Sequence, residues 1–163
     1  MSTENSLISK LSAGVGSISD ACVVLVKTTW NSSVTDELEK GSIKILKEAG
    51  VQLIHSISVP GAVELPFAVK YFHAHSTLYR PDAYITLGCV IRGETPHFDY
   101  VCNSVTSGIT DLNLQLDVPV IFGVLTVDNA EQAADRIGGK HGHKGEEFAY
   151  TALKMIDLCR SVK

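Results

Sequence analysis

Residues 93–100, GETPHFDY, place a histidine just after a glycine, a threonine and a proline. Thr95 suits the N-cap of a helix and Pro96 its first residue, so the pattern predicts His97 in the first helical turn. The positive end of the helix dipole disfavours an imidazolium there, and a neutral imidazole can accept and then donate a proton. His97 is therefore a candidate acid–base residue; the alternative interpretation is a solvated loop histidine.

Residues 136–145, RIGGKHGHKG, concentrate basic side chains and glycines. One interpretation is a phosphate clamp, with the guanidinium of Arg136 as a fork-shaped donor. The other is a joint between two helices, with a glycine C-cap and basic residues near a helix end. Backbone N–H groups around Gly93 and Thr95 could also cradle an anion, whereas Glu94 would repel a phosphate unless it turned outward.

Two further residues could take part in chemistry. Trp30, the only tryptophan, directly follows a predicted strand, where its indole could stack on a flat heterocycle or simply cover the core. Cys102 follows His97 by five residues, about 500° of helical rotation, which favours a helix-face cysteine over a Cys–His nucleophile pair. The His-x-His pairs at 73–75 and 141–143 lack companion ligands, and no complete nucleotide-binding loop is present, so neither a metal nor a cofactor is expected.

The elements that must position these residues alternate between strand and helix. Apolar, β-branched runs predict strands at residues 21–27, 51–57, 82–91 and 118–126. Helical spacing and end signals predict helices at residues 31–50, 62–78, 98–116, 129–137 and 146–162. The alternation predicts a flavodoxin-like α/β fold, a three-layer α/β/α sandwich with a four-stranded parallel sheet. Ligands of such sheets bind beyond the carboxyl ends of the strands, where the candidate residues lie.

Length and charge narrow the class of protein. The 163 residues suit one domain, at residues 20–163, preceded by a Ser- and Gly-containing arm, residues 1–19, that is expected to be flexible. A net charge of −4 argues against a general nucleic-acid or anionic-membrane binder. No apolar run approaches the ~20 residues of a membrane span. The four cysteines form no Cys-x-x-Cys pair, which favours the reducing cytoplasm.

Several stretches, in their order along the chain, resemble the 6,7-dimethyl-8-ribityllumazine synthase family of riboflavin biosynthesis. They are VPGAVELPFAVK at 59–70, LGCVIRGETPHFDYVCN at 87–103, VPVIFGVLT at 118–126 and ADRIGGKHGHKG at 134–145. The resemblance covers about residues 18–160. It implies condensation of 5-amino-6-(D-ribitylamino)uracil with 3,4-dihydroxy-2-butanone 4-phosphate, with release of phosphate and water and without a metal or cofactor.

The resemblance also implies a role for each matching residue. It makes His97 the acid–base residue, and it places Trp30, where many members carry Phe, against the pyrimidine ring. It implies further contacts with the ribitylaminouracil from Ala62, Val63, Glu64, Cys89, Val90, Ile91 and, from a neighbouring subunit, Phe122. It implies phosphate contacts from Glu94, Thr95, Arg136 and Lys144.

Assembly is a further implication of the resemblance. Family members are at least pentamers with active sites between subunits, and the N-terminal arm adds a strand to a neighbour's sheet. Some members build a shell of twelve pentamers, and the short joint at 138–145 favours shell formation here, although His143 stands where shell-forming members usually carry Asn. Riboflavin synthase is an expected partner. The alternative function is a flavin- or lumazine-binding shell protein without turnover, which the presence of His97, Thr95 and Arg136 together disfavours.

Overall fold

The computed structural model of the protein describes residues 18–163, so the predicted arm, its flexibility and its strand exchange lie almost wholly outside the described residues. The central sheet has four parallel strands in the order β2-β1-β3-β4. They are β1 (Cys22–Thr28), β2 (Leu53–Val59), β3 (Ala83–Ile91) and β4 (Val120–Val127). The prediction of a four-stranded parallel sheet is confirmed.

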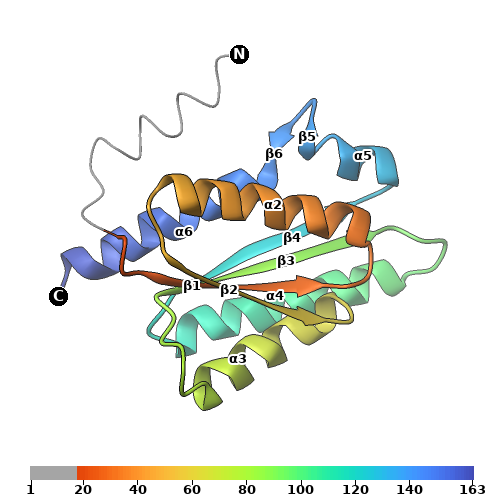
Figure 1. Cartoon of the computed structure of the whole chain (residues 1–163). Helices are drawn as coiled ribbons and strands as arrows, with labels where there is room; N and C mark the ends of the chain where they lie inside the picture. Colours follow the sequence, from red (N-terminus) through yellow and green to blue (C-terminus); the bar gives the residue numbers. More distant parts are fainter. Residues whose placement is uncertain (1–17) are drawn as a thin grey trace.

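Helices cover both faces of this sheet, as Figure 1 shows. Helices α2 (Ser32–Glu48) and α6 (Lys144–Ser161) pack on one face, and α3 (Leu65–His75) and α4 (His97–Gln115) pack on the other. Alternate residues of β1 serve the two layers: Val23 and Leu25 belong to one hydrophobic cluster, and Val24 and Val26 to the other. A strand buried on both faces must be apolar throughout, which explains its continuous run of β-branched residues.

The segment after β2 shows how proline sets a helix boundary. A short 3-10 helix, η1 (Ala62–Glu64), precedes α3, and Pro66 lies in the first turn of α3, as expected. Helix α3 ends at His75, earlier than the predicted residue 78, because Ser76 adopts an extended backbone.

The start of α4 differs from the prediction in its cap. Pro96, not Thr95, is the N-cap residue, and no side chain caps this end, so His97 is the first residue of the helix. The prediction of Thr95 as N-cap was wrong by one residue: Pro96 has ψ −3°, well short of the roughly −42° of a regular α-helix, so the helix begins only at His97.

The basic glycine-rich segment also differs from the prediction. Helix α5 covers only Ala130–Ala134, and the chain then forms an antiparallel hairpin of β5 (Ile137–Gly139) and β6 (Gly142–His143). Gly138 and Gly142 have φ values of 112° and 74°, a region that favours glycine. The segment does join two helices, α5 and α6, but it does so as a hairpin. The interpretation of a glycine C-cap was wrong, because Asp135 is the C-cap of α5.

Candidate active site

A pocket of about 380 Å³ opens at the carboxyl ends of the central strands, a volume in the range of small-molecule sites. The turns after β1 and β2, the end of β3 and the start of α4 line it. Among the residues predicted from the sequence, those that line the pocket are Trp30, Ala62, Val63, Glu64, Cys89, Val90, Ile91 and His97. The fold thus brings the acid–base candidate and the predicted uracil contacts into one cavity.

Four lining residues were not predicted as site residues: Thr28, Asn31, Gly61 and Val101. Thr28 is the last residue of β1, and Asn31 and Gly61 lie in the turns after β1 and β2; these positions at the carboxyl ends of strands are the signal that could have found them. Val101 lies one helical turn after His97 on α4, where its spacing marked it only as part of the apolar stripe.

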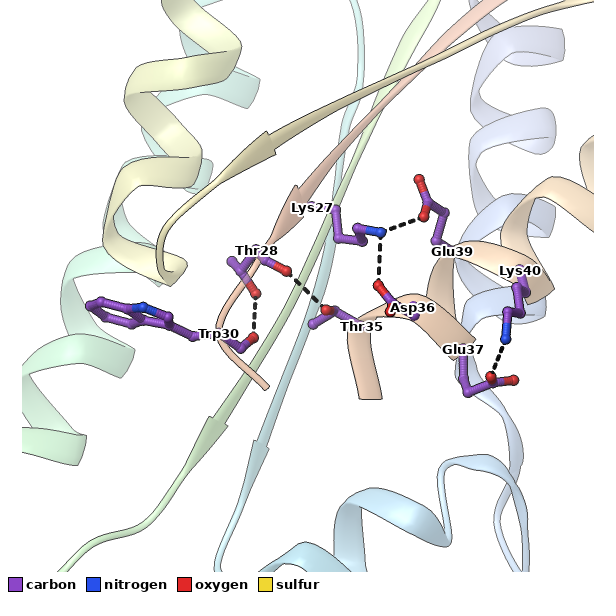
Figure 2. Close-up of polar contacts among 8 residues, drawn as sticks. All are labelled: Lys27, Thr28, Trp30, Thr35, Asp36, Glu37, Glu39 and Lys40. Carbon is purple, nitrogen blue, oxygen red and sulfur yellow. Dashed lines mark hydrogen bonds and ion pairs between the residues drawn. The ribbon is translucent and has the colours of Figure 1, made fainter. Parts of the chain in front are cut away.

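The turn after β1 holds the backbone of Trp30 at both ends. The Trp30 amide donates to the carbonyl of Pro60 at 3.0 Å, and the Trp30 carbonyl accepts from the hydroxyl of Thr28 at 3.1 Å. The hydroxyl of Thr35, in the first turn of α2, donates in turn to the Thr28 carbonyl at 2.9 Å. Figure 2 shows the Trp30 indole extending away from these contacts, and the side chain is 67% exposed. The indole therefore presents an open face to the pocket.

Asn31, next along the chain, contacts the end of β3 at the pocket. Its backbone is left-handed, with φ 57° and ψ 41°, and its side chain makes no capping hydrogen bond to α2. Instead, its amide Nδ2 donates to the carbonyl of Cys89 on β3 at 2.8 Å. The turn after β1 and the end of β3 are thereby joined.

Glu64 and Gly61 form the wall that follows β2. The Gly61 amide donates to Oε2 of Glu64 at 3.0 Å, which closes the short η1 helix. The Glu64 side chain thus has a fixed orientation at the pocket, although it is exposed. A carboxylate in this place can accept hydrogen bonds from hydroxyl groups of a ligand.

Beneath the first turns of α2, a partly buried cation holds the helix on the sheet. The Lys27 ammonium contacts Asp36 at 2.8 Å and Glu39 at 2.6 Å (Figure 2), and its side chain is 17% exposed. Burial by itself disfavours the charged ammonium, but the hydrogen bonds to Asp36 and Glu39 outweigh it and raise the pKa of Lys27 above its ordinary value. Lys27 supports the turn that carries Trp30 and does not line the pocket.

Arg92 directly follows β3, and its contacts hold the loop that leads to His97 at the start of α4. Its Nε donates to Asp128 at 3.1 Å, its NH1 lies 3.4 Å from Asp99, and its guanidinium stacks 4.1 Å from the centre of the Phe98 ring. His97 is exposed at the pocket, where it can exchange protons with a ligand. The loop residues Glu94 and Thr95 are exposed and do not line this pocket.

The remaining predicted residues lie outside the pocket of their own chain. Arg136 donates through NH1 to the carbonyl of Gln132 at 2.7 Å, and the Lys144 ammonium contacts both carboxylate oxygens of Glu147, at 2.9 and 2.8 Å. Phe122 is 38% exposed on β4. One chain therefore does not bring Phe122, Arg136 or Lys144 to this pocket.

The cysteines give no sign of nucleophilic chemistry. Burial raises the pKa of the Cys89 thiol to about 11, and burial followed by the charge of Asp99 raises that of Cys102. Both thiols are therefore protonated near neutral pH, and Cys102 does not line the pocket that His97 lines.

Within residues 18–163, no group of three or more His, Cys, Asp or Glu side chains could hold a metal ion. No helix in this range is both long and apolar enough to span a bilayer.

Several known proteins are similar to this chain over most of its length. The family model described as 6,7-dimethyl-8-ribityllumazine synthase matches residues 20–160. A 6,7-dimethyl-8-ribityllumazine synthase of Cytophaga hutchinsonii is 44% identical over 158 residues, which cover 96% of this chain and 98% of the relative. Relatives of the same name from Porphyromonas gingivalis and Bacteroides fragilis are 49% and 46% identical, over 86% and 85% of this chain and 87% and 96% of theirs. With the motifs distributed along its whole domain and relatives this similar over nearly their full length, the chain belongs to the 6,7-dimethyl-8-ribityllumazine synthase family.

Proposed function

We propose that the protein condenses 5-amino-6-(D-ribitylamino)uracil with 3,4-dihydroxy-2-butanone 4-phosphate to 6,7-dimethyl-8-ribityllumazine, releasing phosphate and water. The observation that carries the proposal is the pocket itself, in which the Trp30 indole, the backbone at the end of β3 and the His97 imidazole face one cavity of about 380 Å³. Membership in the family supplies the identity of the substrates.

The uracil ring lies against the face of the Trp30 indole in this proposal, because a flat aromatic heterocycle gains most from an offset stack. Backbone groups of Cys89, Val90 and Ile91 meet the polar edge of the ring. Ala62 and Val63 line the apolar side of the site, and Glu64 accepts hydrogen bonds from ribityl hydroxyls. The orientation of Glu64 by Gly61 and the exposed face of Trp30 support this placement.

The reaction consists of proton transfers around carbon–nitrogen bond formation. The uracil amine adds to the ketone and loses water to form an imine, phosphate is eliminated, and ring closure with loss of a second water completes the second ring. His97 moves protons in these steps, since an imidazole has one ring nitrogen that can accept a proton and one that can donate it. His97 is the first residue of α4, whose N-terminal end has no side-chain cap. It is exposed at the pocket, where both substrates can reach it.

The phosphate of the second substrate binds beside His97 in this scheme, with the loop at Glu94 and Thr95 on one side. Phe122, Arg136 and Lys144 complete the site from an adjacent copy of the chain, because they lie outside the pocket of their own chain. A site shared in this way requires a homo-oligomer, for which we propose a pentamer and, from the short hairpin at 137–143, a shell of twelve pentamers. We propose riboflavin synthase as the enzyme that takes up the product. We also propose a cytoplasmic location, because free cysteines are typical of a reducing compartment.

The proposal is tested by mixing the purified protein with both substrates and following lumazine absorbance together with phosphate release. Controls omit the enzyme, since the condensation proceeds slowly unaided, and omit each substrate in turn. Acceleration that requires the phosphate substrate supports the synthase. Quenching of Trp30 by the uracil without any acceleration would instead indicate a binding-shell protein. Sedimentation of the same sample separates a pentamer from a shell of twelve pentamers.

A further inference from the structure

The end of β3 extends beyond its pairing with β1. The β1–β3 register ends at Lys27 and Leu87, whereas β3 continues to Ile91. The carbonyl of Cys89, a buried residue, lies in this extension and accepts the Asn31 amide at 2.8 Å. A side chain from the β1–α2 turn thus satisfies a backbone group that β1 no longer reaches, as buried polar groups require.

The backbone of Asn31 is constrained so that this contact can form. Asn31 is the one non-glycine residue with positive φ within residues 18–163. Asparagine tolerates this conformation better than most residues, yet it is still costly, and such positions cluster at functional sites. An asparagine at the start of a helix normally caps it, but this side chain makes no capping bond and contacts a strand 58 residues away in sequence.

We propose that Asn31 is a positioning residue for the uracil substrate, a role that rests on the proposed function. The hydrogen bonds of the Trp30 backbone run to Thr28 and Pro60, on the β1 and β2 side of the pocket. Asn31 adds the tie to the β3 side. The indole is largely exposed and contacts Gly61 on the β2 side, so the Asn31 bond sets the distance between the turn that carries the indole and the Cys89 backbone.

That distance matters for binding more than for chemistry. A flat ring held between the indole and the end of β3 fits only if the two walls keep their spacing. His97 lies on a different element, the first turn of α4, and does not depend on the tie. Loss of the tie therefore raises the KM for the uracil and leaves the KM for the phosphate substrate and kcat within about twofold of wild type.

Two substitutions separate the amide from the backbone conformation. Asn31→Gly removes the side chain but suits positive φ, so a purely conformational role predicts unchanged or improved behaviour. Positioning by the amide predicts a rise in the KM for the uracil of about fivefold, in line with loss of one neutral hydrogen bond. Asn31→Asp keeps the size and the backbone preference but places an acceptor against the Cys89 carbonyl, so its KM should rise further.

A second measurement does not depend on turnover. Trp30 is the only tryptophan, so time-resolved fluorescence anisotropy of the ligand-free protein reports the motion of this one indole. Both Asn31 variants should show a larger sub-nanosecond component than the wild type. This result is expected even if the wild type shows no synthase activity, which would reject the proposed function and leave the positioning role standing.

Asn113 provides the matched control. Its side chain donates to the carbonyls of Ile109 and Val120 and accepts from the amide of Val120. Val120 is the first residue of β4, so these bonds lie at the end of the sheet opposite the pocket. Asn113→Asp should lower Tm and leave the uracil KM and the Trp30 anisotropy unchanged. An anisotropy equal to that of the wild type in both Asn31 variants would overturn the proposal, as would a wild-type KM for the uracil in Asn31→Gly from an active enzyme.

Discussion

The indole of Trp30 lies directly against the α-carbon of Gly61. A methyl group added at residue 61 would lie 2.7 Å from both Cε3 and Cζ3 of the indole, closer than carbon atoms approach in proteins. Gly61 has φ −135° and ψ −179°, an extended backbone that any residue adopts. A larger residue here would therefore force the indole to move, whereas the backbone conformation places no demand for glycine.

Gly61→Ala should displace the indole and weaken binding of the uracil substrate. We expect the KM for the uracil to rise about tenfold, equivalent to about 1.4 kcal/mol, which lies within the usual cost of overpacking. A titration of uracil binding checks this, by Trp30 quenching in the wild type and by calorimetry in all variants. In a Trp30→Ala background the same substitution should have no further effect, and additive losses in the double variant would contradict the contact.

His97→Ala should slow turnover with little change in stability. A general acid–base group typically contributes a factor of 10² to 10⁴, and we expect kcat to fall by about a hundredfold. Because His97 is exposed in the first turn of α4, the free energy of unfolding should change by less than about 0.5 kcal/mol. His75→Ala, an exposed histidine outside the pocket, is the control. Normal turnover with a large loss of Tm would show a structural role instead.

Arg136→Ala should raise the KM for the phosphate substrate far more than the KM for the uracil. The guanidinium is a bidentate partner for phosphate, and in this proposal it acts on the substrate held by an adjacent chain. Arg136→Lys should restore part of the loss, because it keeps the charge without the fork. Separate titration of each substrate at saturating concentrations of the other makes the comparison, and equal effects on both KM values would exclude a phosphate clamp.

Lys27→Met should destabilise the protein, because it leaves Asp36 and Glu39 without their shared cation. Since Asp36 is half exposed, we expect a loss of about 1–2 kcal/mol, less than for a fully buried pair. Lys40→Met, which removes the exposed Lys40–Glu37 pair seen in Figure 2, should leave the stability near that of the wild type. Denaturant unfolding of both variants tests the difference.

The same cluster predicts a pH dependence. The pKa of Lys27 in the folded chain is raised above its value in the unfolded chain, about 10.4. Its stabilising contribution is therefore fully present below about pH 10 and is lost as the pH rises through the raised pKa. The stability advantage of the wild type over Lys27→Met should stay constant from pH 7 to about pH 10 and shrink above it. An advantage that already declines between pH 7 and 9 would point to other groups.

Local pattern was enough to predict most of the fold. The run at 21–27 is apolar at every position but its last, because β1 is buried on both faces, and Pro66 marked the start of α3 through its missing N–H. The glycines at 138 and 142 were visible but ambiguous, because a glycine C-cap and a glycine hairpin use the same positive φ. Only pairing of the two short strands separates these structures, and that pairing depends on the surrounding chain.

The sequence by itself determined the strand–helix alternation, the position of candidate residues just after the strands, and the family. Those features depend only on neighbouring residues and their spacing along the chain. The tertiary structure alone decided which residues share a pocket: it gave Cys89 a partner in Asn31, set Trp30 on Gly61, and kept Arg136 away from His97 of its own chain. These relations join segments 30 to 60 residues apart, and their geometry is set by strand order and register, which no local pattern encodes.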